Sequence, residues 1–286
     1  MTTSFFLQML LNGLQLASIY ILVALGFTLI FGILHIVNMA QGSVFMLGGY
    51  AIWLTFVVLG LNYYVSLLLT IIIVAGIGLF FEKAVFRRLQ GLVMPTVIVS
   101  LALMQVLEQT VILTFGIKEK IVPTPFPGLL KFWGTVFPTQ RLVIMLIAIA
   151  LTAALVWWVQ KSKIGLALRA VAMDRETASI YGISSTRYGA LAFALGFGLA
   201  GAAGGLIAPL YYVDPMMGAQ PLLKMFTVIV VGGLGSLPGT ILAGIILGLI
   251  DSFVATLFNS VAAAMVGFAM IIGVLVVRPT GLLGHE

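Results

Sequence analysis

The sequence predicts an all-α, polytopic integral membrane protein with roughly eight or nine transmembrane helices, including discontinuous or re-entrant segments. Of the 286 residues, 62% are hydrophobic and only 8% are charged. Soluble domains carry about 25% charged residues, so this composition excludes a soluble globular protein. The first charged side chain is Glu82, and several membrane spans must therefore precede it.

Apolar runs along the chain predict the individual spans, because a membrane-crossing helix needs about 20 mainly apolar residues. The run at 222–236 is short for a full crossing, and a re-entrant hairpin is the alternative there. The predicted spans cover residues 5–33, 37–59, 62–81, 93–115, 141–160, 188–213, 222–236, 238–258 and 260–277.

The basic residues between these runs predict the orientation. Lys83, Arg87 and Arg88 follow the third run, and five further bases lie in residues 161–187. Both loops face the cytoplasm by the positive-inside rule. Residues 116–140 must then form an ordered loop on the outer side, rich in proline and aromatic residues such as Trp133. With nine crossings, the amino terminus is outside and the carboxyl terminus inside. Topology thus explains the net charge of +6 better than a nucleic-acid partner does.

Two polar, glycine-rich segments, residues 32–50 and 232–239, interrupt the apolar chain. Irregular backbone at membrane depth is tolerated where protein buries it or where it lines an aqueous cavity. Broken helices of this kind often form the substrate route in transporters. A simple loop at the membrane surface is the alternative for each segment. The residues predicted to line a translocation path are Asn38, Gln41, Gly42, Ser43, Gly235 and Ser236.

Small residues are concentrated at 196–205, and Gly244 and Gly248 follow at a spacing of four. Small side chains let membrane helices approach closely. Both segments are therefore predicted to be helix-packing surfaces.

Two acidic residues, Glu108 and Asp251, fall inside predicted spans, where ionisable side chains are costly. Each has three alternatives: a structural or interfacial role, a place on the transport path, or proton coupling. Asp214 and Lys224 border a short loop and are expected to be solvated.

Catalytic and metal-binding side chains are scarce. The chain has no cysteine, and its two histidines are His35 and His285. Thiolate sites are excluded, and little material is left for a metal centre or a catalytic triad. We therefore expect no enzymatic activity and no metal, and we interpret His35 as a hydrogen-bonding residue at a helix end.

The segment 161–187 concentrates seven charged residues. Within it Asp174 can cap a helix start, Glu176 lies in the favourable first turn, and Gly182 suits the left-handed position after the helix end. This pattern predicts a helix of about two turns on the cytoplasmic face, used to dock another protein; a solvated loop is the alternative. The side chains expected to be exposed on it are Ala178, Ile180 and Tyr181.

Several motifs resemble those of the permease subunits of ABC importers for branched-chain amino acids, a family that also includes urea and short-chain amide permeases. Residues 169–183 resemble the coupling loop of that family, and residues 26–50 its amino-terminal signature. Residues 231–239 and 278–284 resemble its carboxyl-terminal motifs. The matches span nearly the whole chain in order, and the chain resembles the shorter partner of the permease pair. One departure is Gln41, where many relatives have histidine.

The resemblance implies a single transmembrane permease domain over residues 1–286 in a bacterial inner membrane, with a cytoplasmic coupling loop at 161–187. Its implied partners are a homologous second permease in a heterodimer, two ATP-binding subunits and an extracytoplasmic substrate-binding protein. The residues implied in ATPase coupling are Arg169, Asp174, Arg175, Glu176, Ala178, Tyr181 and Gly182.

No G-x-x-x-x-G-K-[ST] motif occurs in the chain, so any ATP must be hydrolysed by partner subunits and no cofactor is expected here. The predicted function is passage of branched-chain or related amino acids. Urea or short-chain amide transport is the alternative within the family. The rivals outside it are an ion-coupled secondary transporter using Glu108 or Asp251, and a passive channel for a small neutral solute.

Overall fold

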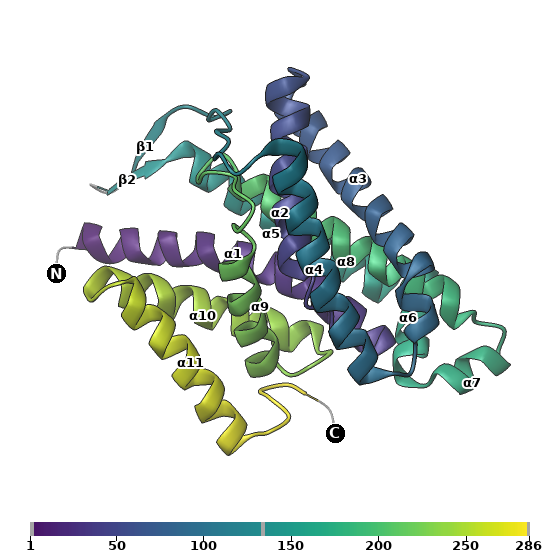
Figure 1. Cartoon of the computed structure of the whole chain (residues 1–286). Helices are drawn as coiled ribbons and strands as arrows, with labels where there is room; N and C mark the ends of the chain where they lie inside the picture. Colours follow the sequence, from purple (N-terminus) through teal and green to yellow (C-terminus); the bar gives the residue numbers. More distant parts are fainter. Residues whose placement is uncertain (1–2, 133–134, 285–286) are drawn as a thin grey trace.

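The computed structural model describes residues 3–132 and 135–284 (Figure 1). In this part of the chain eight helices are long and apolar enough to cross a membrane, so the predicted all-α membrane fold is confirmed. These helices are α1 (Thr3–Leu34), α2 (Gln41–Ile52) with its π-helical continuation (Trp53–Val58), α3 (Tyr63–Ala84), α4 (Val93–Phe115), α5 (Thr139–Lys161), α8 (Ser185–Ile207), α10 (Leu237–Leu257) and α11 (Ser260–Val277).

The remaining elements are short. A 3₁₀ turn (Phe86–Leu89) joins α3 to α4, and α6 (Lys163–Met173) and α7 (Arg175–Ile180) follow α5. The short apolar helix α9 (Ala219–Gly232) lies between α8 and α10. The loop between α4 and α5, which is predicted to face outward and is called the outer loop, contains an antiparallel hairpin of β1 (Leu129–Phe132) and β2 (Thr135–Pro138) that the sequence did not predict. Trp133 and His285 lie outside the described residues.

The centre of the bundle is formed by α1 and α8. In each of them, 78% of an 18-residue apolar stretch is buried. Helix α1 packs along α10 and α8, while α2 and α3 cover other faces of α8. By contrast, only 11% of the corresponding 18-residue stretch of α11 is buried. Figure 1 shows α1 crossing the molecule from the amino terminus toward the end that carries α6 and α7.

Glycines make this close packing possible, as the run at 196–205 predicted. A methyl group on Gly26 would lie 2.5 Å from the carbonyl oxygen of Gly196, and the reverse contact is equally short. Methyl groups on Gly48 and Gly204 would meet the backbone of the facing helix at less than 3.0 Å. In α10, a methyl group on Gly248 would meet the backbone of Ala17 in α1, and one on Gly244 would meet the side chain of Ile21.

The first predicted break lies inside the protein. Gly26 and Gln41 both contact Gly196, so α2 begins about two turns deeper than the end of α1 at Leu34. The connecting residues 35–40 return into the bundle, where several of their polar groups form hydrogen bonds. The amide of Met39 donates to the hydroxyl of Ser100 at 3.0 Å. This arrangement satisfies the rule that irregular backbone in a membrane is covered by protein.

The second predicted break, residues 232–239, contains a turn at residues 233–236 that lies close to the end of α1. Gly235 packs against Gly32, two residues before α1 ends. The carboxyl-terminal segment covers this turn, because the amides of Leu282 and Leu283 donate to the carbonyls of Val231 and Gly232. This break is therefore a covered turn near one end of the bundle, and not a deep interruption.

A third break, residues 208–218, was not predicted; α8 ends at Ile207, although the apolar run continues to 213. Val213 pairs with Lys120 of the outer loop through two backbone hydrogen bonds of 2.8 and 3.0 Å. Gly218 then meets Gly42 near the start of α2. The irregular segment thus descends into the bundle before α9 begins.

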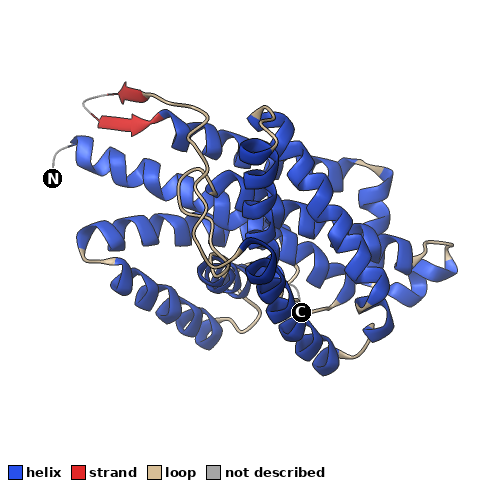
Figure 2. Ribbon diagram, turned by 45° about the horizontal axis from the view of Figure 1, so that its top comes forward, coloured by secondary structure: helices blue, strands red, loops and turns tan. Residues whose placement is uncertain are grey.

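Helix α9 has 14 residues and is therefore about 21 Å long, too short for a hydrocarbon core of about 30 Å. It completes a ninth passage only together with residues 208–218. The first and last described segments consequently lie at opposite ends of the bundle: the carbonyl of Ser4 accepts from the hydroxyl of Thr135 in the hairpin, while Leu282 contacts Val231. Figure 2 shows the hairpin beside the amino-terminal end of α1.

Candidate functional site

The coupling-loop helix predicted around Asp174–Gly182 is present as α7. The carboxylate of Asp174 accepts from the amides of Glu176 at 2.9 Å and Thr177 at 3.2 Å, and also from the Thr177 hydroxyl. Gly182 has a φ of 78°, and the amide of Ile183 donates to the carbonyl of Ala178 at 3.0 Å. These contacts are an N-cap and a Schellman-type C-cap, as predicted.

Hydrogen bonds from Thr177, and then from the amide of Glu176, hold the pKa of Asp174 below its ordinary value. The charged carboxylate therefore stabilises α7 fully at any pH above the ordinary pKa of an aspartate. This stabilisation is lost only when the pH falls through the lowered pKa of Asp174. The cap therefore stays charged at neutral pH.

The tip of α7 is exposed, with one exception. Ile180 and Tyr181 are 83% and 80% exposed, whereas Ala178 is only 4% exposed. The expectation that Ala178 is exposed is therefore wrong. Even a helix this short has an inner face, and Ala178 joins the apolar cluster that contains Leu168 and Val171 of α6.

The predicted coupling residues do not all point outward. Arg175 donates from Nε and Nη2 to the carbonyl of Ile33 in α1, at 3.2 and 3.1 Å, and burial lowers its pKa. Arg169 donates to the carbonyl of Gln160 at the end of α5 at 3.1 Å. Arg175 thus joins α7 to α1, while Glu176 stays exposed.

The residues predicted to line a translocation path are buried or packed against backbone in this structure. Gln41 donates to the carbonyl of Gly196 at 3.0 Å, and Ser43 donates to the carboxylate of Glu108 at 3.1 Å. Asn38 caps the backbone of Ala40 at 3.1 Å. The hydroxyl of Ser236 accepts from the amide of Gly239 and caps α10. Gly42 packs on Gly218. Gly235 borders a small cavity of about 70 Å³. Their place on a path stays a prediction.

Gln41 offers a direct test of its packing role. Replacing it with alanine removes the hydrogen bond to Gly196 and leaves the Asn38 amide without this partner. We expect the free energy of unfolding in detergent to fall by about 1–2 kcal/mol. Thermal unfolding of purified protein measures this change, with Gln8→Ala at an exposed position near the start of α1 as the control. Equal stability of the two variants would contradict a packing role.

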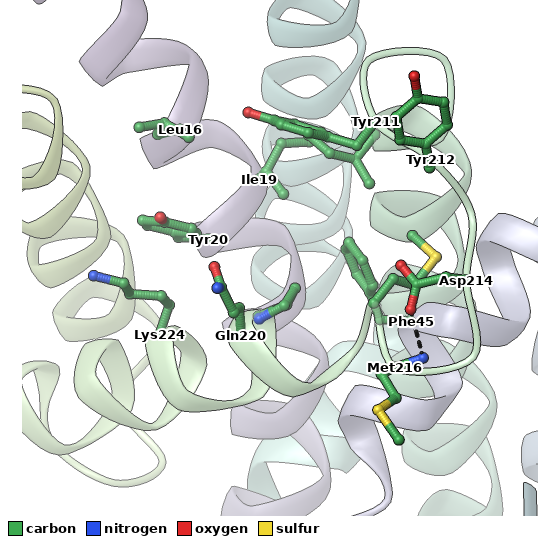
Figure 3. Close-up of a pocket in the computed structure, with 13 residues that line it drawn as sticks. Leu16, Ile19, Tyr20, Phe45, Tyr211, Tyr212, Asp214, Met216, Gln220 and Lys224 are labelled. Atoms are coloured by element: carbon green, nitrogen blue, oxygen red, sulfur yellow. Dashed lines mark hydrogen bonds between the residues drawn. The ribbon is translucent and has the colours of Figure 1, made fainter. Parts of the chain in front are cut away.

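A cavity with a volume of about 370 Å³ lies between α1, α2, α9 and the irregular segment 208–218 (Figure 3). Its wall is mainly apolar, with a few polar groups. None of the predicted path residues lines it. The residues around it are Leu16, Ile19, Tyr20, Phe45, Ile207, Tyr211, Tyr212, Asp214, Met216, Met217, Gln220, Pro221 and Lys224.

An ion pair lies beside this cavity. The ammonium of Lys224 in α9 lies 2.7 Å from both carboxylate oxygens of Asp251 in α10, and the hydroxyl of Tyr20 in α1 donates to one of them at 3.0 Å. Asp251 is 4% exposed. The expectation that Lys224 is solvated is wrong, since its ammonium turns inward to this acid. Asp214 is held in a turn, where it accepts from the amide of Met216 at 2.7 Å.

A sequence signal for this pair existed. An acid within a span needs a partner, and the short apolar helix α9 carries a single cation, Lys224. His35 lies just after the end of α1, where its amide donates to the carbonyl of Phe31 at 2.7 Å and its φ is 54°. A hydrogen-bonding role for its side chain stays a prediction. Among the described residues, no group of three or more His, Cys, Asp and Glu side chains is placed to hold a metal.

Residues 9–275 match a family described as branched-chain amino acid transport system / permease component. The chain belongs to this permease family. The permease is 33% identical to the high-affinity branched-chain amino acid transport system permease protein BraD of Pseudomonas aeruginosa, over 98% of this chain and 96% of that relative. It is 31% identical to the corresponding protein LivH of Escherichia coli K12, with the same coverage of both chains.

A more distant relative is the probable branched-chain amino acid transport permease protein LivH of Methanocaldococcus jannaschii, 27% identical over 98% of this chain and 93% of that relative. No solved structure matches the permease. Its family is one of transport permeases and not of enzymes. With eight candidate spans in its described residues and these relatives, the permease is a multi-pass protein of the inner membrane.

Proposed function

We propose that the permease forms the membrane path of an ABC importer for branched-chain or related amino acids. An extracytoplasmic binding protein delivers the substrate, a homologous second permease completes a heterodimer, and two separate ATPase subunits supply the energy. The family match and the names of the relatives support the transported class. The chain carries no P-loop motif of its own, which supports separate ATPases.

The observation that carries the coupling role is the exposed tip of α7. Its two large side chains, Ile180 and Tyr181, are more than three-quarters exposed on a helix capped at both ends. Exposed apolar and aromatic side chains on a rigid element are typical of protein contacts. An ATPase subunit that binds this tip displaces α7 as a unit, and Arg175 transfers the displacement to α1. Because α1 packs along α8 and α10, the centre of the bundle moves with it.

The apolar wall of the cavity favours an amino acid with an aliphatic side chain over urea or a short amide. Leu16, Ile19 and Phe45 offer aliphatic and aromatic surface, and urea has no apolar part to place there. ATP-driven uptake of radiolabelled leucine and of urea by the same reconstituted complex decides between these substrates. Urea uptake without leucine uptake would overturn the proposed substrate class.

The docking role is tested with the double variant I180D/Y181D in the complex reconstituted with its partner subunits. We expect substrate-stimulated ATPase activity and uptake to fall about tenfold, because desolvating two carboxylates at a protein contact is costly. Leu92→Asp is the control, since Leu92 is exposed and lies outside residues 161–187. Intact coupled ATPase activity and uptake in I180D/Y181D would show that α7 is not the docking element.

A further inference from the structure

The ion pair between Lys224 and Asp251 has no part in the coupling path described above. It lies inside the bundle, where α9 meets α10, and Tyr20 reaches it from α1. The side chain of Lys224 is 21% exposed and that of Asp251 is 6% exposed. Lys224 and Tyr20 both line the large cavity. Asp251 is not among the lining residues; it lies behind Lys224 and Tyr20, and both of these contact its carboxylate.

Stability alone gives little reason for such a pair. Moving two charges out of water costs free energy that their attraction barely recovers, and a well-packed apolar pair often stabilises a protein equally well. Ionisable groups within membrane spans are usually tied to a substrate or ion pathway. Lys224 and Tyr20 connect this pair to the wall of an aliphatic cavity, and this position favours a role in the substrate pathway.

The remaining side chains of the cavity suit one chemical class. Figure 3 shows Tyr20, Gln220 and Lys224 at one end, with Leu16 and Ile19 on the adjoining wall. A free amino acid with an aliphatic side chain has the matching parts: an ammonium and a carboxylate on one carbon, and an apolar side chain. A volume of about 370 Å³ falls within the range of roughly 300–1,000 Å³ typical of small-molecule sites.

We propose that Lys224 and Asp251 form a transient site for the head group of a zwitterionic amino acid. The ion pair opens, the substrate carboxylate binds the Lys224 ammonium, and the substrate ammonium binds the Asp251 carboxylate, which Tyr20 holds in place. The aliphatic side chain lies against Leu16 and Ile19. This inference rests on the proposed function, because it assigns a binding site to the proposed substrate.

Charge balance supports this exchange. The lysine and the aspartate sum to zero, and so does the zwitterion, so the number of uncompensated charges in the membrane does not change. Each substrate charge gains a partner while the protein loses one internal pair. The internal pair thus competes with the substrate, and binding is weak. Weak binding suits a transport path, from which the substrate must also leave.

The test compares the double variant K224M/D251L with the wild-type complex in proteoliposomes containing the partner subunits and leucine-loaded binding protein. The double variant replaces the ion pair with an apolar pair, which preserves packing. We expect the complex to assemble normally but to lose at least tenfold in leucine uptake. Uptake at the wild-type level would overturn the proposal, since a purely structural pair is replaceable in this way.

Lys224→Arg is the second variant, and it covers the case in which the double variant does not fold. Arginine keeps the charge and can bind Asp251 through two parallel hydrogen bonds, which makes the pair harder to open. We expect unchanged or higher thermal stability with at least a fivefold loss of leucine uptake. Stability and uptake that both match the wild type would overturn the proposal. A wild-type complex without ATP-driven leucine uptake would instead refute the proposed function itself.

Discussion

Replacing Gly204 with leucine is expected to remove the folded permease from the membrane. Gly204 lies in α8, and any side chain there would meet the backbone carbonyl of Phe45 in α2 at less than 3.0 Å. A side chain in the way could change its rotamer, but the obstacle here is the backbone of a buried helix. We expect a loss of about 3 kcal/mol or more, at the upper end of overpacking effects, and almost no monodisperse protein after detergent extraction.

Gly273→Leu is the matched control for this prediction. Gly273 is also a glycine within an apolar helix, α11, but a side chain at this position meets no atom within 4 Å. The added side chain therefore disturbs no packing at this position. Leucine also has a higher helix propensity than glycine, which stabilises α11 slightly. Both variants are compared by extraction yield, size-exclusion profile and thermal unfolding. If Gly204→Leu extracts and melts like Gly273→Leu, the contact between α2 and α8 is looser than described.

Arg175→Met is expected to uncouple ATP hydrolysis from transport. Its guanidinium donates two hydrogen bonds to the carbonyl of Ile33, and hydrogen bonds from a charged group contribute about 1.5–3 kcal/mol each. Arg175 is half-buried, so we take the lower end of this range for each bond. The two bonds together then contribute about 3 kcal/mol, which corresponds to about a hundredfold change in the equilibrium constant that couples α7 to α1. We expect ATPase subunits to bind normally while uptake per ATP hydrolysed falls by about that factor.

The control for Arg175→Met is Arg187→Met. Arg187 is an exposed base in the first turn of α8, within the same segment 161–187, so the change in net charge is identical but the link to α1 is kept. Uptake per ATP hydrolysed is measured in proteoliposomes for both variants, together with binding of the ATPase subunits. Equal loss in the two variants would mean that loop charge, and not the contact with Ile33, carries the effect.

Local rules were enough to predict α7 and its ends. Asp174 and Gly182 act within a few residues of themselves, so their spacing alone fixes where the helix begins and ends. The spans were equally accessible, because the lipid environment demands long apolar segments. The role of the glycines at 196–205 followed from size alone, without knowledge of the facing helix.

The break at 208–218 and the position of Lys224 were not accessible in the same way. Hydropathy reports burial and not backbone conformation, and the apolar residues after Ile207 continue the run although the helix has ended. Pro209 and Pro215 were the available signals. Lys224 appeared solvated because its partner, Asp251, is 27 residues away, and only the packing of α9 on α10 brings the two together. The cavity likewise depends on where the irregular segment lies.

The uninterrupted length of α1 has a thermodynamic consequence. With 32 residues it measures about 48 Å. It contacts Arg175 near one end and the outer hairpin, through Ser4, near the other. A stiff rod of this kind has few internal degrees of freedom to absorb a displacement. Suppose that binding of a partner at one end of α1 changes the binding free energy of a partner at the other end. By linkage, the second partner then changes the binding free energy of the first by the same amount.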